Sequence, residues 1–478
     1  MNEVDLNKQL NSQPEPSVLE NKQYVKMTQT PISRLIIGLG IPTMLNMMVT
    51  SLYNMADTYF VSGLGARATG AVSVVLSLTS IIQAIGFTFG MGSGSIVSKL
   101  LGAKNRAEAD KVASSSFFVA GAIGLLITIF GLLFLTPLMK LLGAPIELDG
   151  GYTTMDYAKE YSRVILLAAP IMCMSFVMNN LLRAEGKAVL SMIGLVSGAV
   201  INVALDPLFI YTFKMGMAGA AIATIISQTI SFSILLYLFL SGKSIVRFKF
   251  KTISTKLKTY KEIIATGFPS FCRQVLASIC TVLLNWAVQP YEGAQAALGV
   301  VQKVFMLAFS ISLGIGQGYQ PVLGYNYSAK RYDRVKKGYL FTLTFSTCLM
   351  AVFAIICAIL APKIMYVFLP TSPQAVQIGT LSLRLQCLCM PLLPVNFMAG
   401  VTYQVVGNKG IASLLSISRQ GLFYIPAVFI LPATIGLLGV QCCQSVSDVC
   451  SFLFAIPFTI LFFKHLKSKE KDLIKETC

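Results

Sequence analysis

Two aspartates lie inside long apolar segments, and they are the residues of this sequence best placed to do chemistry. Asp57 ends the run YNMAD, which begins at Tyr53 near the end of the first apolar segment, and Asp206 lies in the segment GAVINVALDPLFIY. A carboxylate in hydrocarbon must be desolvated or must face a polar cavity, and either is costly enough to indicate a function. We therefore interpret the two carboxylates as the ion-coupling centre of a membrane transporter.

Polar neighbours favour a cation site at these carboxylates. Helical spacing places Tyr53 and Asn54 on the same face as Asp57, and Asn202 beside Asp206. A carboxylate at low dielectric favours its protonated form and would release the proton when it is hydrated. Two such groups close together would share a proton or, with further oxygens, would hold a sodium ion between Asp57, Asn202 and Asp206. The alternative is that each carboxylate is structural and bonded to its polar neighbours. The spacing does not choose between proton and sodium.

The composition indicates which elements must position these residues. Of 478 residues, 55% are hydrophobic and 12% are charged, whereas soluble domains contain roughly 25% charged residues. Apolar stretches of about 20 residues are long enough to cross a bilayer as helices. We therefore predict an all-α integral membrane protein with twelve transmembrane helices. The predicted spans lie near 33–58, 68–97, 112–136, 158–182, 189–211, 216–240, 262–289, 295–322, 339–368, 374–405, 411–431 and 437–463.

The distribution of basic residues predicts the orientation in the membrane. Of the 38 Lys and Arg residues, 28 fall in the N-terminus, the even-numbered loops and the C-terminus, and five fall in the odd-numbered loops. This asymmetry is typical of loops that stay in the cytoplasm, so both termini are predicted to be cytoplasmic. The expected location is the bacterial inner (plasma) membrane. The net charge of +18 is explained in this way, and no nucleic-acid partner is expected.

The chain divides into five predicted parts. Residues 1–30 are expected to form a flexible cytoplasmic N-terminus and residues 31–240 an N-terminal lobe of six helices. A basic cytoplasmic linker at 241–261, with seven Lys and Arg residues, precedes a second six-helix lobe at 262–463. Residues 464–478 form a cytoplasmic tail.

The two predicted lobes are similar in sequence. The tripeptide GIP at 40–42 recurs as GFP at 267–269, and a glycine ladder at 90, 92 and 94 recurs at 314, 316 and 318. A duplicated six-helix unit predicts two pseudo-symmetric lobes around a central cavity, related by an axis along the membrane normal. The glycine ladders lack the GK[ST] ending of a phosphate loop, so we interpret them as close-packing faces of helices.

The second lobe differs in its charged residues. Asp448 is its only carboxylate deep in a span, while four basic or amide side chains lie within apolar spans: Arg273, Gln274, Lys303 and Arg384. Either some of these groups pair internally, with Asp448 bonded to a basic partner, or unpaired cations line the cavity and admit anionic groups. Arg419 lies near the start of its span and is expected to reach the cytoplasmic interface.

Four segments resemble one transporter family. They are SLYNMADTYFVSGLG, GMGSGSIVSKLLGAKNR, LLRAEGK and INVALDPLFIYTFKMGMAGAAIAT. They resemble the multidrug and toxic compound extrusion (MATE) transporters, most of all the prokaryotic DinF-like branch. The resemblance implies twelve helices in two lobes and export of organic, often cationic, compounds in exchange for protons or sodium ions. It implies no cofactor beyond that coupling ion.

The resemblance also implies roles for particular residues. Asp57 and Asp206 would be the coupling carboxylates, with Asn202, Tyr161 and Thr224 completing their polar cluster. Substrate would contact residues of both lobes, namely Tyr53, Asn54, Asn179, Asn180, Arg273, Gln274, Lys303 and Arg384. The other main branch of the family places a coupling glutamate in the seventh helix, where this sequence has Ala277.

The expected function is a secondary multidrug antiporter that works by alternating access. Its partners would be small-molecule drugs or toxic metabolites and membrane lipids, and it would act as a monomer. One alternative is a lipid-linked oligosaccharide flippase of the same superfamily, or an exporter of anionic metabolites. A membrane-embedded enzyme is disfavoured because the sequence offers no nucleophile or metal-binding cluster, and its only histidine is His465. No catalytic residue is expected.

Overall fold

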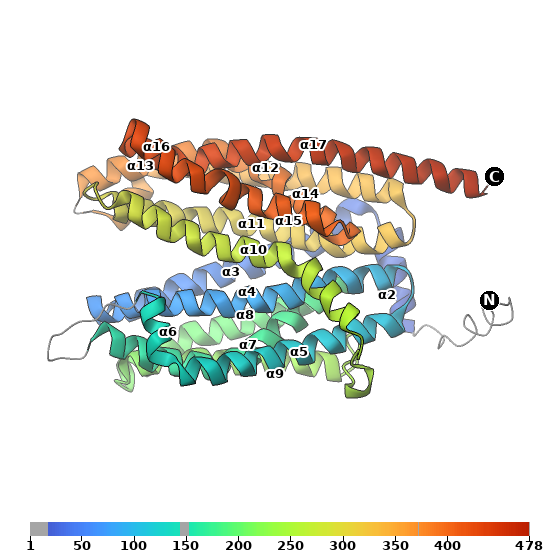
Figure 1. Ribbon diagram of the computed structural model, residues 1–478, viewed down its shortest axis with the longest axis horizontal. Helices are drawn as coiled ribbons and strands as arrows, with labels where there is room; N and C mark the ends of the chain where they lie inside the picture. Colours follow the sequence, from blue (N-terminus) through green and yellow to red (C-terminus); the bar gives the residue numbers. More distant parts are fainter. Residues whose placement is uncertain (1–17, 144–152, 371, 478) are drawn as a thin grey trace.

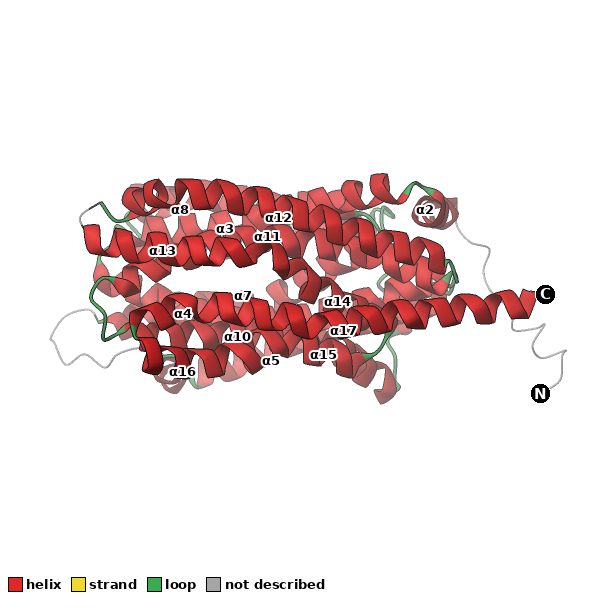
Figure 2. Ribbon diagram, turned by 90° about the horizontal axis from the view of Figure 1, so that it is seen from above, coloured by secondary structure: helices red, strands yellow, loops and turns green. Residues whose placement is uncertain are grey.

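The protein is built from helices throughout the described residues, which are 18–143, 153–370 and 372–477 of the computed structural model (Figure 2). Twelve helical stretches are long and apolar enough to cross a membrane. The first six are α3 (Ile32–Ser62), α4 (Ala66–Gly102), α5 (Arg106–Leu133), α7 (Thr154–Ala184), α8 (Ala188–Pro207) with η1 (Leu208–Thr212), and α9 (Gly216–Leu240).

The second six follow the same order. They are α10 (Leu257–Val288), α11 (Ala294–Ser328), α12 (Tyr332–Phe368), α13 (Pro373–Cys389) with η3 (Met390–Leu392) and α14 (Leu393–Val406), α15 (Lys409–Ile417) with η4 (Ser418–Tyr424) and α16 (Ile425–Ile435), and α17 (Leu437–Thr477). Three short helices complete the described elements: α2 (Val18–Gln29), α6 (Leu135–Leu141) and η2 (Phe250–Thr252). The predicted all-α fold with twelve spans is confirmed.

The helices form two lobes that lie side by side. We call α3–α9 the N lobe and α10–α17 the C lobe; they occupy the lower and upper halves of Figure 1. The main contacts between them are α3 with α11 and α10 with α4. Since α10 and α11 are the counterparts of α3 and α4 in the second copy, these two contacts are reciprocal. Reciprocal contacts are what a pseudo-twofold axis between duplicated lobes requires.

Glycines allow the two lobes to approach backbone to backbone. A Cβ added at Gly267 of α10 would overlap the carbonyl oxygen of Thr88 on α4, and one added at Gly318 of α11 would overlap the backbone of Gly40 on α3. Small residues permit such close approach between membrane helices, where dispersion contacts replace the hydrophobic effect. The interpretation of the glycine ladders as packing faces is therefore confirmed.

The lobe contact is confined to one part of the helices. On α11, Ser310 and Gly314 lie against α3, and Ser310 shares a hydrogen bond of 2.9 Å with Ser51. Lys303 lies on the same face of α11, two turns away, yet it is exposed. On α4, Ile81 is 42% exposed although it lies two turns from Thr88 on the face that packs on α10. Towards the end opposite α2, the facing surfaces of α11 and α4 therefore carry exposed side chains.

The segment that precedes α3 is more ordered than the sequence suggested. Residues 18–29, predicted to be flexible, form α2, which runs across both lobes at one end of the bundle (Figure 1). Gln23 donates to the backbone oxygen of Glu185 in the N lobe (2.8 Å), and Asn326 of the C lobe donates to that of Met27 (3.1 Å). The prediction is wrong for these residues because their partners lie far away in the sequence; residues 1–17 are outside the described part.

The basic segment between the lobes packs on the N lobe. The buried carboxylate of Glu185 accepts hydrogen bonds from the hydroxyl of Ser244 (2.5 Å) and from the backbone N–H groups of Ile245 (2.8 Å) and Val246 (3.0 Å). Three donors on one carboxylate hold this turn in place. At the other terminus, the predicted tail continues α17 as a helix to Thr477 (Figure 2).

The glycine contact predicts that an alanine substitution lowers the stability of the protein, the opposite of its usual effect inside a helix. Gly→Ala inside a helix normally stabilises by about 1 kcal/mol, and Gly299→Ala on α11, where nothing lies within 4 Å of the added carbon, should be neutral or raise the unfolding temperature. Gly267→Ala should instead lower it by a few degrees, because overpacking typically costs about 1–3 kcal/mol. Thermal unfolding of the two purified variants in detergent measures both. Equal shifts would contradict the tight contact between α10 and α4.

Candidate functional site

The structure brings Asp57 and Asp206 together. Asp57 lies in the last third of α3 and is 7% exposed, and Asp206 lies in the last turn of α8 and is fully buried. The two carboxylates are close enough to interact electrostatically, and Tyr53, one turn before Asp57, is close to both. The packing of α8 along α3 creates this arrangement. Two acids separated by about 150 residues in the chain therefore form one site.

The helix that carries Asp206 changes its winding directly after this residue. Pro207 has no N–H group to donate to the carbonyl of Val203, so an ordinary α-helical bond is missing there. The chain continues as the π-helix η1, and such wider turns occur frequently at functional sites. Beyond it, the hydroxyl of Tyr211 donates to the carbonyl oxygen of Phe60 (2.6 Å), which ties η1 to the end of α3. Pro207 is thus followed directly by a π-helical segment.

Three further predicted residues complete the cluster. The Nδ2 atom of Asn202 donates to Oδ1 of Asp206 (3.1 Å) and lies 3.5 Å from the hydroxyl of Thr224 on α9. The Tyr161 hydroxyl on α7 is 3.5 Å from the same Thr224 oxygen and also faces the carboxylate of Asp57. Four helices, α3, α7, α8 and α9, each supply a polar side chain. We call these residues, together with Tyr53, the acid cluster.

Several oxygens of the acid cluster have no hydrogen-bond donor. Among the described residues, none donates to Oδ1 of Asp57, Oδ2 of Asp206 or Oδ1 of Asn202, and all three atoms are buried. A buried acceptor without a partner costs about 1–3 kcal/mol, and a buried unpaired carboxylate costs more. Buried oxygens of this kind are suited to a proton or a small hard cation.

The predicted substrate residues of the N lobe have mixed outcomes. Tyr53 belongs to the acid cluster, whereas the side chain of Asn54 lies outside the part of the chain that the structure describes. Asn179 is buried and donates to the hydroxyl of Ser191 on α8 (2.7 Å), so the prediction that it faces a cavity is wrong. The same holds for Asn180, which is also buried in a hydrogen-bonded network. Both amides satisfy buried polar groups where helices cross.

The network around Asn180 includes an arginine that sequence reasoning did not assign. Arg183 of α7 is 4% exposed and donates to Oδ1 of Asn180 (2.7 Å) and to the side-chain oxygen of Gln317 on α11. It therefore joins the two lobes through neutral amide oxygens. The motif LLRAEGK contains this residue, but its partner lies 134 positions later, and no local pattern points to it.

The basic residues of the C lobe do not form one group. Gln274 and Lys303 lie on the faces of α10 and α11 that turn towards the N lobe, and Arg273 points instead towards α14. Arg384 is exposed, and its Nε donates to the carbonyl oxygen of Ala358 on α12 (3.3 Å). Its helix, α13, packs on α11, α12 and α17. The expected contact of Arg384 with substrate stays a prediction.

A buried ion pair shows that Asp448 of the C lobe is bonded to a basic partner. Nε of Arg419 lies 2.7 Å from Oδ1 of Asp448, and Gln444 donates to the same oxygen (2.8 Å). The arginine side chain is 11% exposed and the aspartate is fully buried. The predicted internal pairing of Asp448 is confirmed. The prediction that Arg419 reaches the interface is wrong, because Arg419, the second residue of the π-helix η4, is held inside the lobe by Asp448 of α17.

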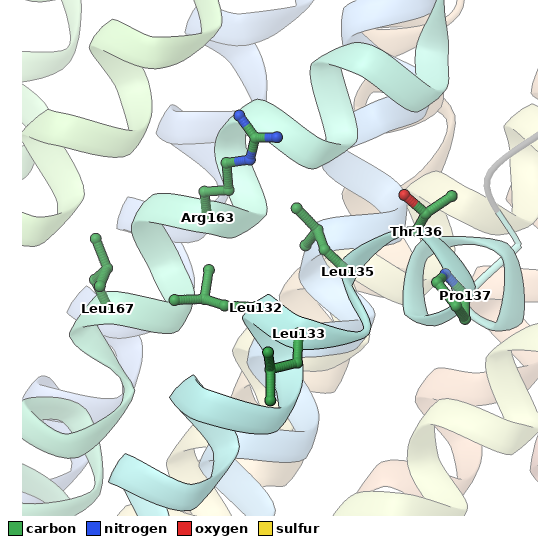
Figure 3. Close-up of a pocket in the computed structure, with 7 residues that line it drawn as sticks. All are labelled: Leu132, Leu133, Leu135, Thr136, Pro137, Arg163 and Leu167. Atoms are coloured by element: carbon green, nitrogen blue, oxygen red, sulfur yellow. The ribbon is translucent and has the colours of Figure 1, made fainter.

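A hollow of about 430 Å³ lies away from the acid cluster, at the corner of α5, α6 and α7. It is lined by Leu132, Leu133, Leu135, Thr136, Pro137, Arg163 and Leu167 (Figure 3). Most of these side chains are apolar, and the guanidinium of Arg163 extends away from the leucines (Figure 3). A charged head above an apolar surface is the arrangement of a basic side chain at a membrane interface. This hollow is not part of the acid cluster.

The fold and the site define a multi-pass membrane protein of two six-helix lobes with a buried acid pair in one of them. The profile of the MatE family matches residues 42–208 and 269–430. This chain belongs to the MatE family.

Relatives and solved structures of this family match almost the whole chain. It is 26% identical over 438 residues to a multidrug export protein, MepA, of Staphylococcus haemolyticus (strain JCSC1435), which covers 91% of this chain and 95% of that protein. For MepA of Staphylococcus aureus (strain MSSA476), the identity is 26% over 463 residues, with coverage of 96% and 100%.

Two solved structures illustrate the structural match. The outward-facing conformation of a multidrug resistance MATE family transporter of the MOP superfamily matches with a TM-score of 0.87 at 27% identity, covering 93% of this chain and 98% of that one. A MOP superfamily transporter from Pyrococcus furiosus Vc1 (DSM3638), described by the reverse polarity of its binding pocket, matches with a TM-score of 0.86 at 27% identity and the same coverage.

The buried ion pair yields a prediction about stability. Asp448→Asn should lower the unfolding temperature of the purified protein by several degrees, because removing one partner of a buried pair costs about 3–5 kcal/mol. The double variant Arg419→Leu/Asp448→Leu should recover most of the loss, since no charge is left buried. As a control, Glu108→Gln removes the exposed partner of Lys111 and should change little. A double variant as unstable as the single one would contradict a pair-specific effect.

Proposed function

We propose that this protein is a secondary active multidrug efflux antiporter that exports organic, often cationic, compounds in exchange for protons or sodium ions. The observation that carries the proposal is the acid cluster, in which buried oxygens of Asp57, Asp206 and Asn202 have no hydrogen-bond donor among the described residues. The multidrug export proteins among its relatives support the substrate class. The coupling ion would be the only small cofactor of the cycle, and the protein would act as a monomer.

The arrangement of the lobes supports an outward-open state. The lobes touch through glycines towards the end where α2 lies, and Ile81 and Lys303 on the facing surfaces are exposed towards the other end. Basic loops retained in the cytoplasm would place α2 and the end of α17 on the cytoplasmic side of the bacterial plasma membrane. The exposed part of the facing surfaces would then be open to the outside. Similarity to an outward-facing MATE transporter agrees with this assignment.

Exchange of the cation for the exported compound would follow because the acid cluster is hydrated differently in the outward-open and inward-open states. In the outward-open state, a cation enters the acid cluster and neutralises the two carboxylates while the exported compound leaves. Rocking of the lobes then opens the cytoplasmic end, where the cation leaves and a new compound binds. Coupling requires that the two ligands prefer different states or compete for the same site. The π-helix η1 and the lobe contact at Gly267 are the elements that such a motion would change.

The lipid-linked oligosaccharide flippase is a weaker candidate. It requires a strongly cationic cavity, for which the sequence offered Arg273, Lys303 and Arg384. Arg384 bonds to α12, and Arg419 is neutralised by Asp448. Lys303 turns towards the N lobe, which carries a pair of carboxylates, so the facing surfaces are not uniformly cationic.

The acid cluster makes a direct prediction about transport. Asp57→Asn and Asp206→Asn should each abolish ion-driven efflux in proteoliposomes while insertion into the membrane stays normal, because the amide cannot gain or lose the charge that the cation balances. Asp156→Asn is the matched control, since Asp156 caps the start of α7 by bonding Thr153 and lies outside the acid cluster. Imposing pH and sodium gradients separately identifies the ion. Normal efflux by both cluster variants would refute the proposal.

A substitution at Asn202 distinguishes sodium coupling from proton coupling. Its free Oδ1 is a ligand for sodium, whereas a proton needs only the carboxylates. If sodium drives transport, Asn202→Ala should raise the half-saturating sodium concentration about tenfold, the loss expected for one oxygen ligand worth roughly 1.4 kcal/mol. If protons drive it, the response to an imposed pH gradient should keep most of its size. Sodium-driven transport with an unchanged sodium requirement would exclude Asn202 as a ligand.

A further inference from the structure

A row of aromatic rings in the C lobe has an arginine at each end. The guanidinium of Arg273 stacks on the ring of Phe397 at 5.1 Å, and Phe397 meets Phe309 edge to face at 6.1 Å. Phe309 stacks with Phe305 at 6.0 Å, and Arg419 lies over both of these rings, at 5.4 and 4.9 Å. We call these five residues the arginine–phenylalanine row.

The row is built on the helices that correspond to those of the acid cluster. The acid cluster uses the first, fourth, fifth and sixth spans of the N lobe. The row and Asp448 use the same four spans of the C lobe, in α10, α14, η4 and α17, and α11 adds the two phenylalanines. Duplication therefore gave each lobe an internal polar site, acidic in one lobe and basic and aromatic in the other.

The row lies near the contact between the lobes. Arg273 lies less than two turns from Gly267, where α10 touches α4. Arg273, Phe305, Phe309 and Arg419 are all partly exposed although they lie within the lobe, and Phe397 is 8% exposed. Partly accessible side chains near the point where the lobes meet are available to a compound that binds between the lobes.

The two arginines of the row differ in their electrostatic state. Arg419 is neutralised by Asp448 at 2.7 Å. Arg273 donates only to the hydroxyl of Ser270, at 3.4 Å, and no carboxylate within the described ranges pairs with it. A guanidinium carries five N–H donors in a fork that matches a carboxylate. An arginine that keeps its charge inside a protein without an acidic partner is costly, so its free donors indicate a ligand.

We propose that the arginine–phenylalanine row is a substrate subsite for planar aromatic compounds that carry a carboxylate, with the carboxylate on Arg273 and the rings against Phe397 and Phe309. This inference rests on the proposed efflux function and specifies a substrate class within it. Offset or edge-to-face contacts between aromatic rings add about 0.5–1.5 kcal/mol each. A charge-assisted bidentate contact adds more, so the carboxylate dominates recognition. Cationic substrates would depend instead on the acid cluster.

The test compares two dyes that differ only at the carboxyl group. A rhodamine with a free benzoate and its methyl ester share one ring system, and their fluorescence anisotropy reports binding to the full-length protein in nanodiscs. The wild type should bind the acid more tightly than the ester. Arg273→Gln should weaken binding of the acid about tenfold, the loss of one charge-assisted interaction, and should leave the ester within about twofold.

Two further variants control for a general structural effect. Arg273→Lys keeps the charge without the fork and should retain part of the preference for the acid. Arg163→Gln removes an arginine of the other lobe, at the hollow between α5, α6 and α7, and should bind both dyes as the wild type does. Equal binding of acid and ester by the wild type, or an unchanged preference in Arg273→Gln, would overturn the subsite. Failure of the wild type to export either dye under any ion gradient would contradict the efflux function itself.

Discussion

A charged group in a low-dielectric interior must be paired, neutralised or solvated, and this constraint organises both lobes. In the C lobe, Asp448 meets it by pairing with Arg419 at 2.7 Å. In the N lobe, Asp57 and Asp206 lie near each other with no basic partner among the described residues. Their charges must therefore be neutralised by a bound cation or solvated by water. A carboxylate with a basic partner keeps its charge and its position. Two carboxylates without such a partner gain or lose a cation whenever their access to water or ions changes, and a transport cycle needs such a group.

The contact between the two lobes is the second feature on which the structure depends. Gly267 against Thr88 and Gly318 against Gly40 bring backbones together over a limited length of the helices. Contacts of this kind derive their strength from dispersion and are lost completely when the surfaces separate. Beyond Ser310 the same face of α11 carries the exposed Lys303. The tight contact is therefore limited to one part of the two faces.

Duplication followed by divergence accounts for the difference between the lobes. Reciprocal contacts of α3 with α11 and of α10 with α4 preserve the symmetry of the frame. The internal polar sites have changed in charge: acids and hydroxyls occupy one, and Arg273, Arg419 and three phenylalanines occupy the other. The frame has small residues where the lobes touch, whereas the interior sites differ in charge between the lobes.

Much of this architecture was predictable because hydrocarbon imposes simple rules. Length and hydropathy are sufficient to predict twelve spans, and aspartates inside apolar segments stand out as functional residues. Asp57, Tyr161, Asn202, Asp206 and Thr224 were expected together and do lie together. The failures are as informative. Asn179 and Arg419 were misplaced because the partner of a side chain depends on which neighbouring helix it meets: Asn179 bonds Ser191, and Arg419 bonds Asp448.

By itself, the amino-acid sequence determined the class of protein, the number of spans, the duplication and the pair of acids, since each of these follows from local composition or from repetition. Only the tertiary structure decided which polar groups are partners. Gln23 with Glu185, Arg183 with Gln317 and Arg419 with Asp448 connect residues on different helices. Helix packing alone sets these distances. It therefore decides which buried polar groups have a partner in the protein and which remain available to a ligand.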